Sequence, residues 1–439
     1  MKEIKLSVVF LTPAVLFFLL LTACSDGIRQ GELATITISL GNSENSRQLV
    51  PLDGTSGTTK ETHTYELSID GASFKAFTPG TTFQVNAGSR TFEIRAYGIP
   101  TDIFITGSNL IVPQSIWDRV KVLRAIGSRS VTVKANQTTT VSIDLYSALD
   151  VSSWEELEWA VQDPQYLVSQ GGGTRKETII LKNAIDMDAN GTITIDRPIE
   201  IRAEGNVTIT RASTFTGAFF NVNSVTGTAG TAGTAGKLAI GATLEGKSIG
   251  SAIILDGGRD SSTSGTSLTV SAPLIVSAGE LTIGKDVTLQ ENSNDYTGSS
   301  SGTSGGSGVH ITDGTFTLFG KISNNETVGS GGGVYVAAGT FVMEEGALIK
   351  GNTAKNGGGV YIATGTFTMN GGAITDNTAT AEGGGVYMIG GIFNIKAAGS
   401  SYKEWVKDNY DPNTPPSNVW IDSSSTAIIE GGSNDNNGW

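Results

Sequence analysis

The stretch that decides the fold is Gly331-Gly-Gly-Val-Tyr335, which recurs as Gly357-Gly-Gly-Val-Tyr361 and again as Gly383-Gly-Gly-Val-Tyr387. The period is 26 residues. Behind the glycine block comes an apolar alternation such as Gly339-Thr-Phe-Val-Met343, followed by a hydrophobic-x-x-Asn turn such as Ile349-x-x-Asn352. A fixed period of this length, with strand-like alternation and no helical spacing, predicts a β-solenoid in which each repeat forms one coil.

Alternation within the repeat separates an inner face from an outer one. In Val334-Tyr335-Val336 the two β-branched residues share one face and the aromatic residue takes the other. We therefore expect one outward column of rings, a strand spacing apart. In the slightly favoured interpretation the rings stack only on each other, or lie under the loop from Tyr402 to Pro416, and stabilise the sheet; in the alternative interpretation they bind sugars or a protein partner. The candidate binding residues are His310, Tyr335, Tyr361, Tyr387 and Trp420.

An asparagine recurs at the same point of successive coils, three residues after a leucine or isoleucine. Side-chain amides carry both donor and acceptor, so copies one strand apart can bond to each other, and asparagine tolerates a left-handed turn. A catalytic or metal-binding role is the weaker alternative, since such a site has no need to repeat in every coil. The predicted ladder residues are Asn292, Asn325, Asn352 and Asn377.

The glycine-triplet and Ile-x-x-Asn pattern resembles the repeats of pectin-lyase-like right-handed parallel β-helices, and is similar to the repeats of polymorphic outer-membrane adhesins. The resemblance covers roughly residues 177–432 and is clear over 305–393. It implies a right-handed parallel β-helix. Those adhesins end in a membrane-spanning barrel, and this sequence has no run of alternating ten-residue segments of the kind that a barrel needs.

The N-terminus resembles a bacterial lipoprotein signal. Lys2 and Lys5 precede an apolar run that ends in Leu21-Thr-Ala-Cys24, which is similar to a lipobox. A spanning anchor is the alternative, but the run is short and charge-poor on its far side. The resemblance predicts a signal peptide over 1–23 and a lipid on Cys24, and Ser25 implies transport to the outer membrane or cell surface.

The composition limits which disulfides, metal sites and partners are possible. Cys24 is the only cysteine and there are two histidines, so neither an intramolecular disulfide nor a His/Cys zinc site is expected. The formal net charge is −13, which makes nucleic acid a poor partner. We expect no cofactor and no metal.

The rest of the chain divides into three further regions, which together predict an all-β fold. Residues 24–149 show alternating strands without a period, which predicts a tether and an antiparallel β-sandwich spacer. Residues 150–176 hold a capping helix and linker, with a capping box at Ser152 and Glu155 and an inner face of Trp154, Leu157 and Val161. Residues 177–439 form the parallel β-helix, with a C-terminal loop at 396–418, which either shields the end or recognises a ligand, and a last coil.

The most favoured function is that of a non-enzymatic, membrane-anchored surface lipoprotein that binds glycans or host or cell-surface proteins. The first alternative is a polysaccharide lyase or hydrolase on the same scaffold. The only compact candidate for a catalytic site of such an enzyme is Asp256-Gly-Gly-Arg-Asp260. An ordinary corner with a solvated ion pair also explains this segment. The second alternative is a structural or ice-binding surface made by the outward threonines Thr315, Thr317, Thr340, Thr366 and Thr368.

Overall fold

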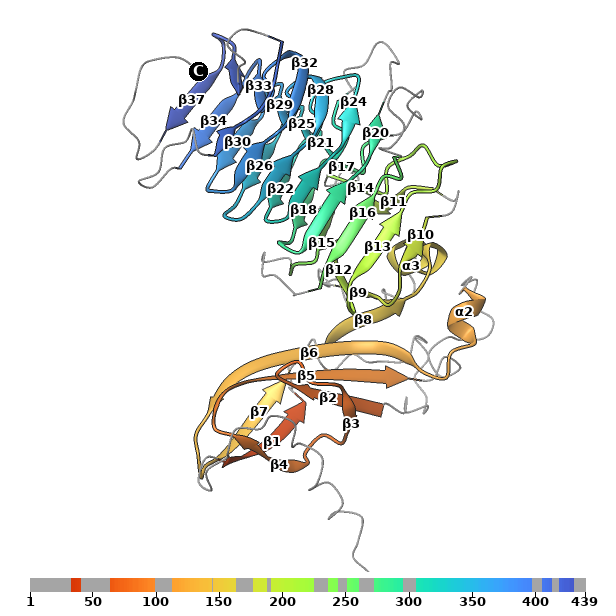
Figure 1. The fold of residues 1–439 in the computed structure, drawn as a ribbon. Coiled ribbons are helices and arrows are strands. Elements are labelled where there is room, and N and C mark those ends of the chain that lie inside the picture. The colour runs from red at the N-terminus through yellow and green to blue at the C-terminus, as the bar shows by residue number, and fades with distance from the viewer. Residues whose placement is uncertain are drawn as a thin grey trace, which may run out of the picture.

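The structure is a computed structural model. It describes residues 33–40, 64–98, 113–143, 145–162, 177–187, 191–224, 236–243, 251–259, 272–294, 305–396, 405–412 and 418–429. Figure 1 shows a small β domain at one end and a long stack of short strands that leads away from it to the C-terminal end. The predicted all-β fold with a parallel β-helix and a short helix is confirmed.

Two sheets form the N-terminal β-sandwich. Their inner faces share one core, in which Ile36 and Ile38 meet Phe92 and Ile94. One sheet has the order β4 (Thr82–Asn86), β1 (Leu33–Leu40), β7 (Thr138–Ile143), and the other begins with β3 (Lys75–Phe77), β2 (Thr64–Ile69), β5 (Gly88–Gly98) and β6 (Val122–Val133). The expectation of purely antiparallel pairing is wrong, because β1 and β7 run parallel. Alternation shows which face of a strand is buried but not the direction of its neighbour.

Strand β8 (Tyr146–Val151) joins the sandwich to the β-helix. It pairs antiparallel with β6 on one side and parallel with β9 (Glu177–Leu181) on the other, so one sheet continues through both regions. Tyr97, Leu123 and Ile126 of the sandwich pack with Ala148 and Ile180 in a shared small core. The sandwich therefore shares both a sheet and a core with the first coil.

Helix α3 (Trp154–Gln162) follows at once. Its capping box lies one residue later than predicted, since Ser153 Oγ accepts a hydrogen bond from the Glu156 backbone N–H at 3.2 Å. The Glu156 carboxylate in turn accepts from the Ser152 N–H at 2.7 Å and pairs with Arg119 at 2.5 Å. The ion pair with a neighbouring segment explains the shift, because it fixes Glu156 inward and leaves Glu155 exposed. Arg119 follows the short helix α2 (Gln114–Trp117).

The inner face of α3 closes the first coil. Trp154, Leu157 and Val161 are fully or almost fully buried, as predicted. The Trp154 ring lies 5.9 Å from that of Phe219 and 6.1 Å from that of Phe220, both inside the β-helix. The helix thus covers apolar side chains that an open solenoid end would expose.

Three long parallel sheets form the walls of the β-helix (Figure 1). The long sheet continues from β9 through β12 (Pro198–Ala203), β15 (Lys237–Ile240), β18 (Glu280–Ile283), β22 (Thr315–Leu318), β26 (Thr340–Met343), β30 (Thr366–Met369), β34 (Ile392–Ile395) and β37 (Thr426–Ile429). The ladder sheet contains β10 (Ile185–Asp186), β13 (Val207–Thr210), β16 (Ile253–Asp256), β19 (Val287–Gln290), β23 (Lys321–Ser323), β27 (Leu348–Lys350), β31 (Ala373–Thr375) and β35 (Val406–Lys407). The aromatic sheet contains β11 (Ile193–Ile195), β14 (Phe220–Val222), β17 (Ile275–Ser277), β21 (Val309–Ile311), β25 (Val334–Val336), β29 (Val360–Ile362), β33 (Val386–Met388) and β36 (Val419–Ile421).

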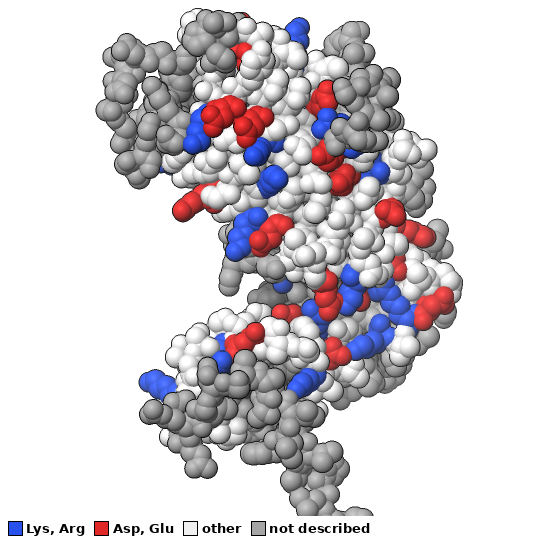
Figure 2. All heavy atoms as spheres, viewed as in Figure 1, with Lys and Arg blue, Asp and Glu red and all other residues white. Residues whose placement is uncertain are grey.

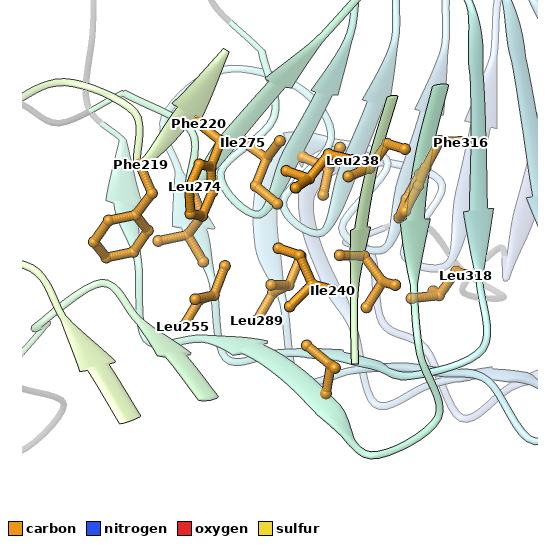
Figure 3. Close-up of a cluster of buried hydrophobic side chains, with 14 of the residues drawn as sticks. Phe219, Phe220, Leu238, Ile240, Leu255, Leu274, Ile275, Leu289, Phe316 and Leu318 are labelled. Atoms are coloured by element: carbon orange, nitrogen blue, oxygen red, sulfur yellow. The ribbon is translucent and has the colours of Figure 1, made fainter. Parts of the chain in front are cut away.

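The interior is apolar and stacked in columns, as Figure 3 shows for its middle coils. Phe316, Phe341, Phe367 and Phe393 are fully buried and face each other at centroid distances of 5.0, 4.7 and 4.8 Å. Each ring covers only the ring of the next coil, so a single coil cannot bury its own inner face. The stack of coils is therefore the cooperative unit.

A fourth, short sheet forms the corner between the ladder sheet and the aromatic sheet. This corner sheet contains β20 (Ser293–Asn294), β24 (Glu326–Thr327), β28 (Thr353–Asn356) and β32 (Thr378–Glu382). The glycine triplets follow it. Gly331 has a φ of +73°, and a Cβ on Gly332 would lie 2.5 Å from the carbonyl oxygen of Gly358 in the next coil. Left-handed backbone and close approach of coils account for the triplets.

The predicted C-terminal loop contains a further coil. Within residues 396–418, Val406–Lys407 forms β35 and pairs with β31, while Trp405 packs against the core. The interpretation of the whole segment as a loop is therefore wrong for these residues. An insertion lengthens this coil and hides its register in a stretch rich in proline and aromatic residues. Tyr402, Pro415 and Pro416 lie outside the described residues.

Candidate binding face

The register of the aromatic sheet brings all five candidate binding residues into one column. His310 pairs with Tyr335, Tyr335 with Tyr361, Tyr361 with Tyr387, and Tyr387 with Trp420. Their β-branched neighbours, such as Val334 and Val336, are fully buried. The aromatic side chains therefore point away from the interior.

The rings form a continuous stack. Centroid distances are 4.9 Å for Tyr335 to Tyr361, 5.4 Å for Tyr361 to Tyr387 and 4.3 Å for Tyr387 to Trp420, with interplanar angles of 9°, 16° and 10°. His310 meets Tyr335 edge-on at 4.9 Å. The spacing equals that of neighbouring strands, so the backbone itself sets the stacking distance.

Stacking determines which part of each ring is open. The faces of Tyr335, Tyr361 and Tyr387 lie against neighbouring rings, so only ring edges and hydroxyl groups are available to a ligand. His310 is 4% exposed and Tyr361 9% exposed. The rings therefore cover one another, as in the slightly favoured interpretation of the sequence, and Tyr335, Tyr387 and Trp420 are each partly exposed.

The tyrosine hydroxyls are held in their neutral form. Burial raises the pKa of Tyr335 and Tyr387, and raises the pKa of Tyr361 to about 12, with a smaller contribution from its two tyrosine neighbours. A protonated phenol both donates and accepts hydrogen bonds. The column therefore presents a row of neutral hydrogen-bonding groups at strand spacing.

His310 begins the column in a dry environment. Burial lowers its pKa to about 4, and within the described part of the chain its Nε2 has no hydrogen-bond partner. Gly305 covers the next ring, because a Cβ there would lie 2.1 Å from Tyr335 Cδ2. His310 is therefore part of the packed end of the column and not of its accessible surface.

The flanks of the column change along the coils. On one side, Gly305, Ser330, Asn356 and Glu382 occupy equivalent positions. On the other side the equivalent residues are Thr312, Ala337, Ala363, Ile389 and Asp422, whose backbone N–H groups donate to the preceding coil. Of the flank residues named here, only Glu382 and Asp422, beside the last two rings, carry a carboxylate. Figure 2 shows charged side chains on the viewed face as small scattered groups of both signs.

The four predicted ladder asparagines are fully buried and bonded from coil to coil. Asn325 Nδ2 donates to Asn352 Oδ1 at 3.0 Å, and Asn352 Nδ2 donates to Asn377 Oδ1 at 2.9 Å. The same oxygens accept the backbone N–H of the preceding asparagine, including that of Asn292. The amides of Asn325, Asn352 and Asn377 therefore each satisfy a backbone donor as well as a neighbouring side chain, whereas the Asn292 Nδ2 donates to the backbone carbonyls of Ala272 and Ser307. With every amide so occupied, the ladder is structural.

The left-handed turn belongs to the residue before each asparagine and not to the asparagine itself. Glu291, Asn324, Asp376 and Asp408 have φ values between 50° and 56°, and Gly351 has a φ of 67°. The predicted reason for asparagine at the ladder position is thus wrong in this part. Asparagine is there for its amide, and its neighbour absorbs the backbone strain.

The ladder extends beyond the predicted residues at both ends. At the C-terminal side, Asn377 donates to Asn409, and Asn409 donates to Asn418 Oδ1 at 3.1 Å. At the other side, the Arg211 guanidinium donates to Oδ1 of Asn292 at 2.7 Å. Arg211 is 5% exposed, and burial lowers its pKa to about 10. The Arg211 side chain spans one coil, which has Gly257 and Gly258 at the corner where later coils have asparagine. The periodic pattern alone therefore does not identify Arg211 as a ladder residue.

The acidic corner at 256–260 is occupied by local bonds. Asp256 accepts from the Gly258 N–H at 2.8 Å and from Gln290 Nε2 at 3.0 Å. Arg259 pairs with Glu326 at 2.6 Å and with Glu291 at 3.3 Å, in the two following coils. Asp260 lies outside the described residues. The described part of this corner forms hydrogen bonds and ion pairs that connect coils.

The lipid site cannot be placed, since Cys24 also lies outside the described residues. Within the ranges that the structure describes, no helix is long and apolar enough to cross a membrane. In the same ranges no group of three or more His, Cys, Asp or Glu side chains is arranged to hold a metal ion.

Comparison with protein families, with curated proteins and with solved structures finds no match to this chain.

Proposed function

We propose that the chain is a non-enzymatic, lipid-anchored bacterial surface protein whose β-helix recognises a glycan or a host or cell-surface protein through the aromatic column. The observation that carries this proposal is the unbroken stack from Tyr335 to Trp420, with ring edges directed outward. The hydroxyl groups repeat at strand spacing on a rigid sheet. Such a row suits a ligand that extends along the β-helix and takes part in repeated hydrogen bonds.

The anchor and the location rest on the sequence. Leu21-Thr-Ala-Cys24 after a short apolar run supports lipid attachment at Cys24 and placement at the outer membrane or cell surface. One or more acyl chains would attach the protein to the membrane without a spanning helix. The β-helix, which extends away from the N-terminal sandwich, would then carry the aromatic column away from the anchor (Figure 1).

The experiment compares wild type with the variant Tyr335→Phe/Tyr361→Phe/Tyr387→Phe on an array of glycans and extracellular matrix proteins. Phenylalanine keeps the stack but removes the hydroxyl groups, so folding is retained while hydrogen bonding to the ligand is lost. The matched control is Thr315→Ser/Thr340→Ser/Thr366→Ser on the long sheet. We expect binding to fall for the tyrosine variant only. Equal binding by all three proteins would contradict the proposed face.

A further inference from the structure

The last two rings of the column differ from the others in their charged neighbours. Burial raises the pKa of Tyr387, and the negative charges of Glu382 and Asp422 raise this pKa further. Within the described residues, neither Glu382 nor Asp422 forms an ion pair with a lysine or arginine. Among the described residues, the two negative charges at this end of the column thus have no lysine or arginine as an ion-pair partner.

Side chains at this end are partly accessible, as that of Tyr335 also is. Tyr387 and Trp420 are half-buried, and the adjacent Ile389 is 41% exposed. Earlier coils have Ser330 and Asn356 on one flank and Ala337 and Ala363 on the other, so they lack charge. Among the described coils, this end of the column combines aromatic rings, an exposed isoleucine and two carboxylates.

We propose that the Tyr387–Trp420 end of the column is a docking surface for a partner protein that presents a basic segment. Charge complementarity selects this partner, since a basic segment laid across this end of the column meets a carboxylate on each flank, Glu382 on one side and Asp422 on the other. The aliphatic part of a lysine or arginine side chain in that segment would pack on the rings and Ile389. The inference rests on the proposed function and names the kind of partner that the column takes.

The test uses the full chain with Glu382→Gln/Asp422→Asn. Both amides retain an oxygen, so the bond from the Ser424 N–H to residue 422 is preserved while both charges are removed. The matched control, Glu345→Gln/Asp408→Asn, removes two exposed charges from other corners of the β-helix. It therefore has the same net charge as the test variant. The probe is a peptide of alternating lysine and leucine, and the negative control is the same peptide with glutamate in place of lysine. Binding of each peptide is measured by titration calorimetry.

At low salt we expect Glu382→Gln/Asp422→Asn to weaken binding of the lysine peptide about tenfold, and the control pair to change it less than about twofold. The difference should shrink as salt is raised, because exposed charge pairs are screened. Equal loss in both variants would mean nonspecific attraction to an acidic protein and would overturn the inference. So would tight binding of a neutral oligosaccharide on the array that Glu382→Gln/Asp422→Asn leaves unchanged. The proposed function itself is tested by a different result. It fails if the variant Tyr335→Phe/Tyr361→Phe/Tyr387→Phe binds the array as wild type does.

Discussion

Replacing Asn352 by leucine tests the ladder at its centre. The wild-type side chain accepts two hydrogen bonds from Asn325, one from its backbone N–H and one from its Nδ2, each at 3.0 Å. It also donates to Ile322 O at 3.2 Å and to Asn377 Oδ1 at 2.9 Å. Leucine has a similar volume and can occupy the site, but it makes none of these bonds.

The expected loss follows from the groups that remain unpaired. The Asn325 N–H, one proton of Asn325 Nδ2 and the Ile322 carbonyl lose their partner in a buried site, whereas Asn377 Oδ1 keeps the backbone N–H of residue 352. At about 2 kcal/mol for each unsatisfied group the cost is about 6 kcal/mol, and burial of leucine offsets about 2–3 kcal/mol. The free energy of unfolding of the β-helix should fall by about 3 kcal/mol.

The measurement is urea unfolding followed by circular dichroism, combined with hydrogen exchange of the peptide that contains Asn325. The control is Asn370→Leu, the same substitution at a half-buried position with one side-chain bond, to Glu344 at 2.9 Å. We expect the control to change stability by less than about 1 kcal/mol. The ladder reasoning is refuted if Asn352→Leu matches Asn370→Leu in stability and leaves exchange at Asn325 slow.

Three further outcomes are expected. Cys24→Ser should abolish labelling with palmitate and release the protein from the membrane fraction; a labelled, membrane-bound mutant would defeat the lipoprotein proposal. Purified protein should release no reducing or unsaturated ends from pectate, alginate or glycosaminoglycans, with or without calcium, and activity that Asp260→Asn abolishes would favour the enzyme alternative. The folded-state pKa of His310, about 4, lies below its ordinary value of 6.5, so the stability that its neutral form contributes is present above pH 6.5 and is lost as pH falls toward 4. The melting temperature of wild type should therefore fall over that range more than that of His310→Gln, and parallel curves would rule out a buried neutral histidine.

The β-helix could be predicted because its information repeats. The glycine triplet, the Phe341 and Phe367 positions and the asparagine corner each recur with the same neighbours, so independent copies give the same register. Stacking then follows from the impossibility of burying a single coil. A residue whose role occurs in only one coil has no repeated copies from which its position can be predicted. Arg211 completes the ladder from an aperiodic position, and nothing local distinguishes it from a surface arginine.

Accessibility of the candidate face could not be predicted from alternation. Period 2 indicates that Tyr361 leaves the interior, but the strand spacing that aligns the column also makes its rings cover each other. The cover over Tyr335 comes from Gly305 and Gly306, in a low-complexity segment without a pattern. Likewise, Asn409 follows Val406 with ladder spacing, yet an insertion before it displaces the period.

The most direct test of the binding face is a hydrogen-exchange footprint of the full chain with whichever partner the array identifies. The account predicts slower exchange in the strands of the aromatic sheet at 360–362, 386–388 and 419–421, strongest at the Trp420 end. It also predicts unchanged exchange in the long sheet at 315–318 and 340–343. Protection confined to the long sheet or to the N-terminal sandwich would contradict the assignment of the aromatic column as the binding face.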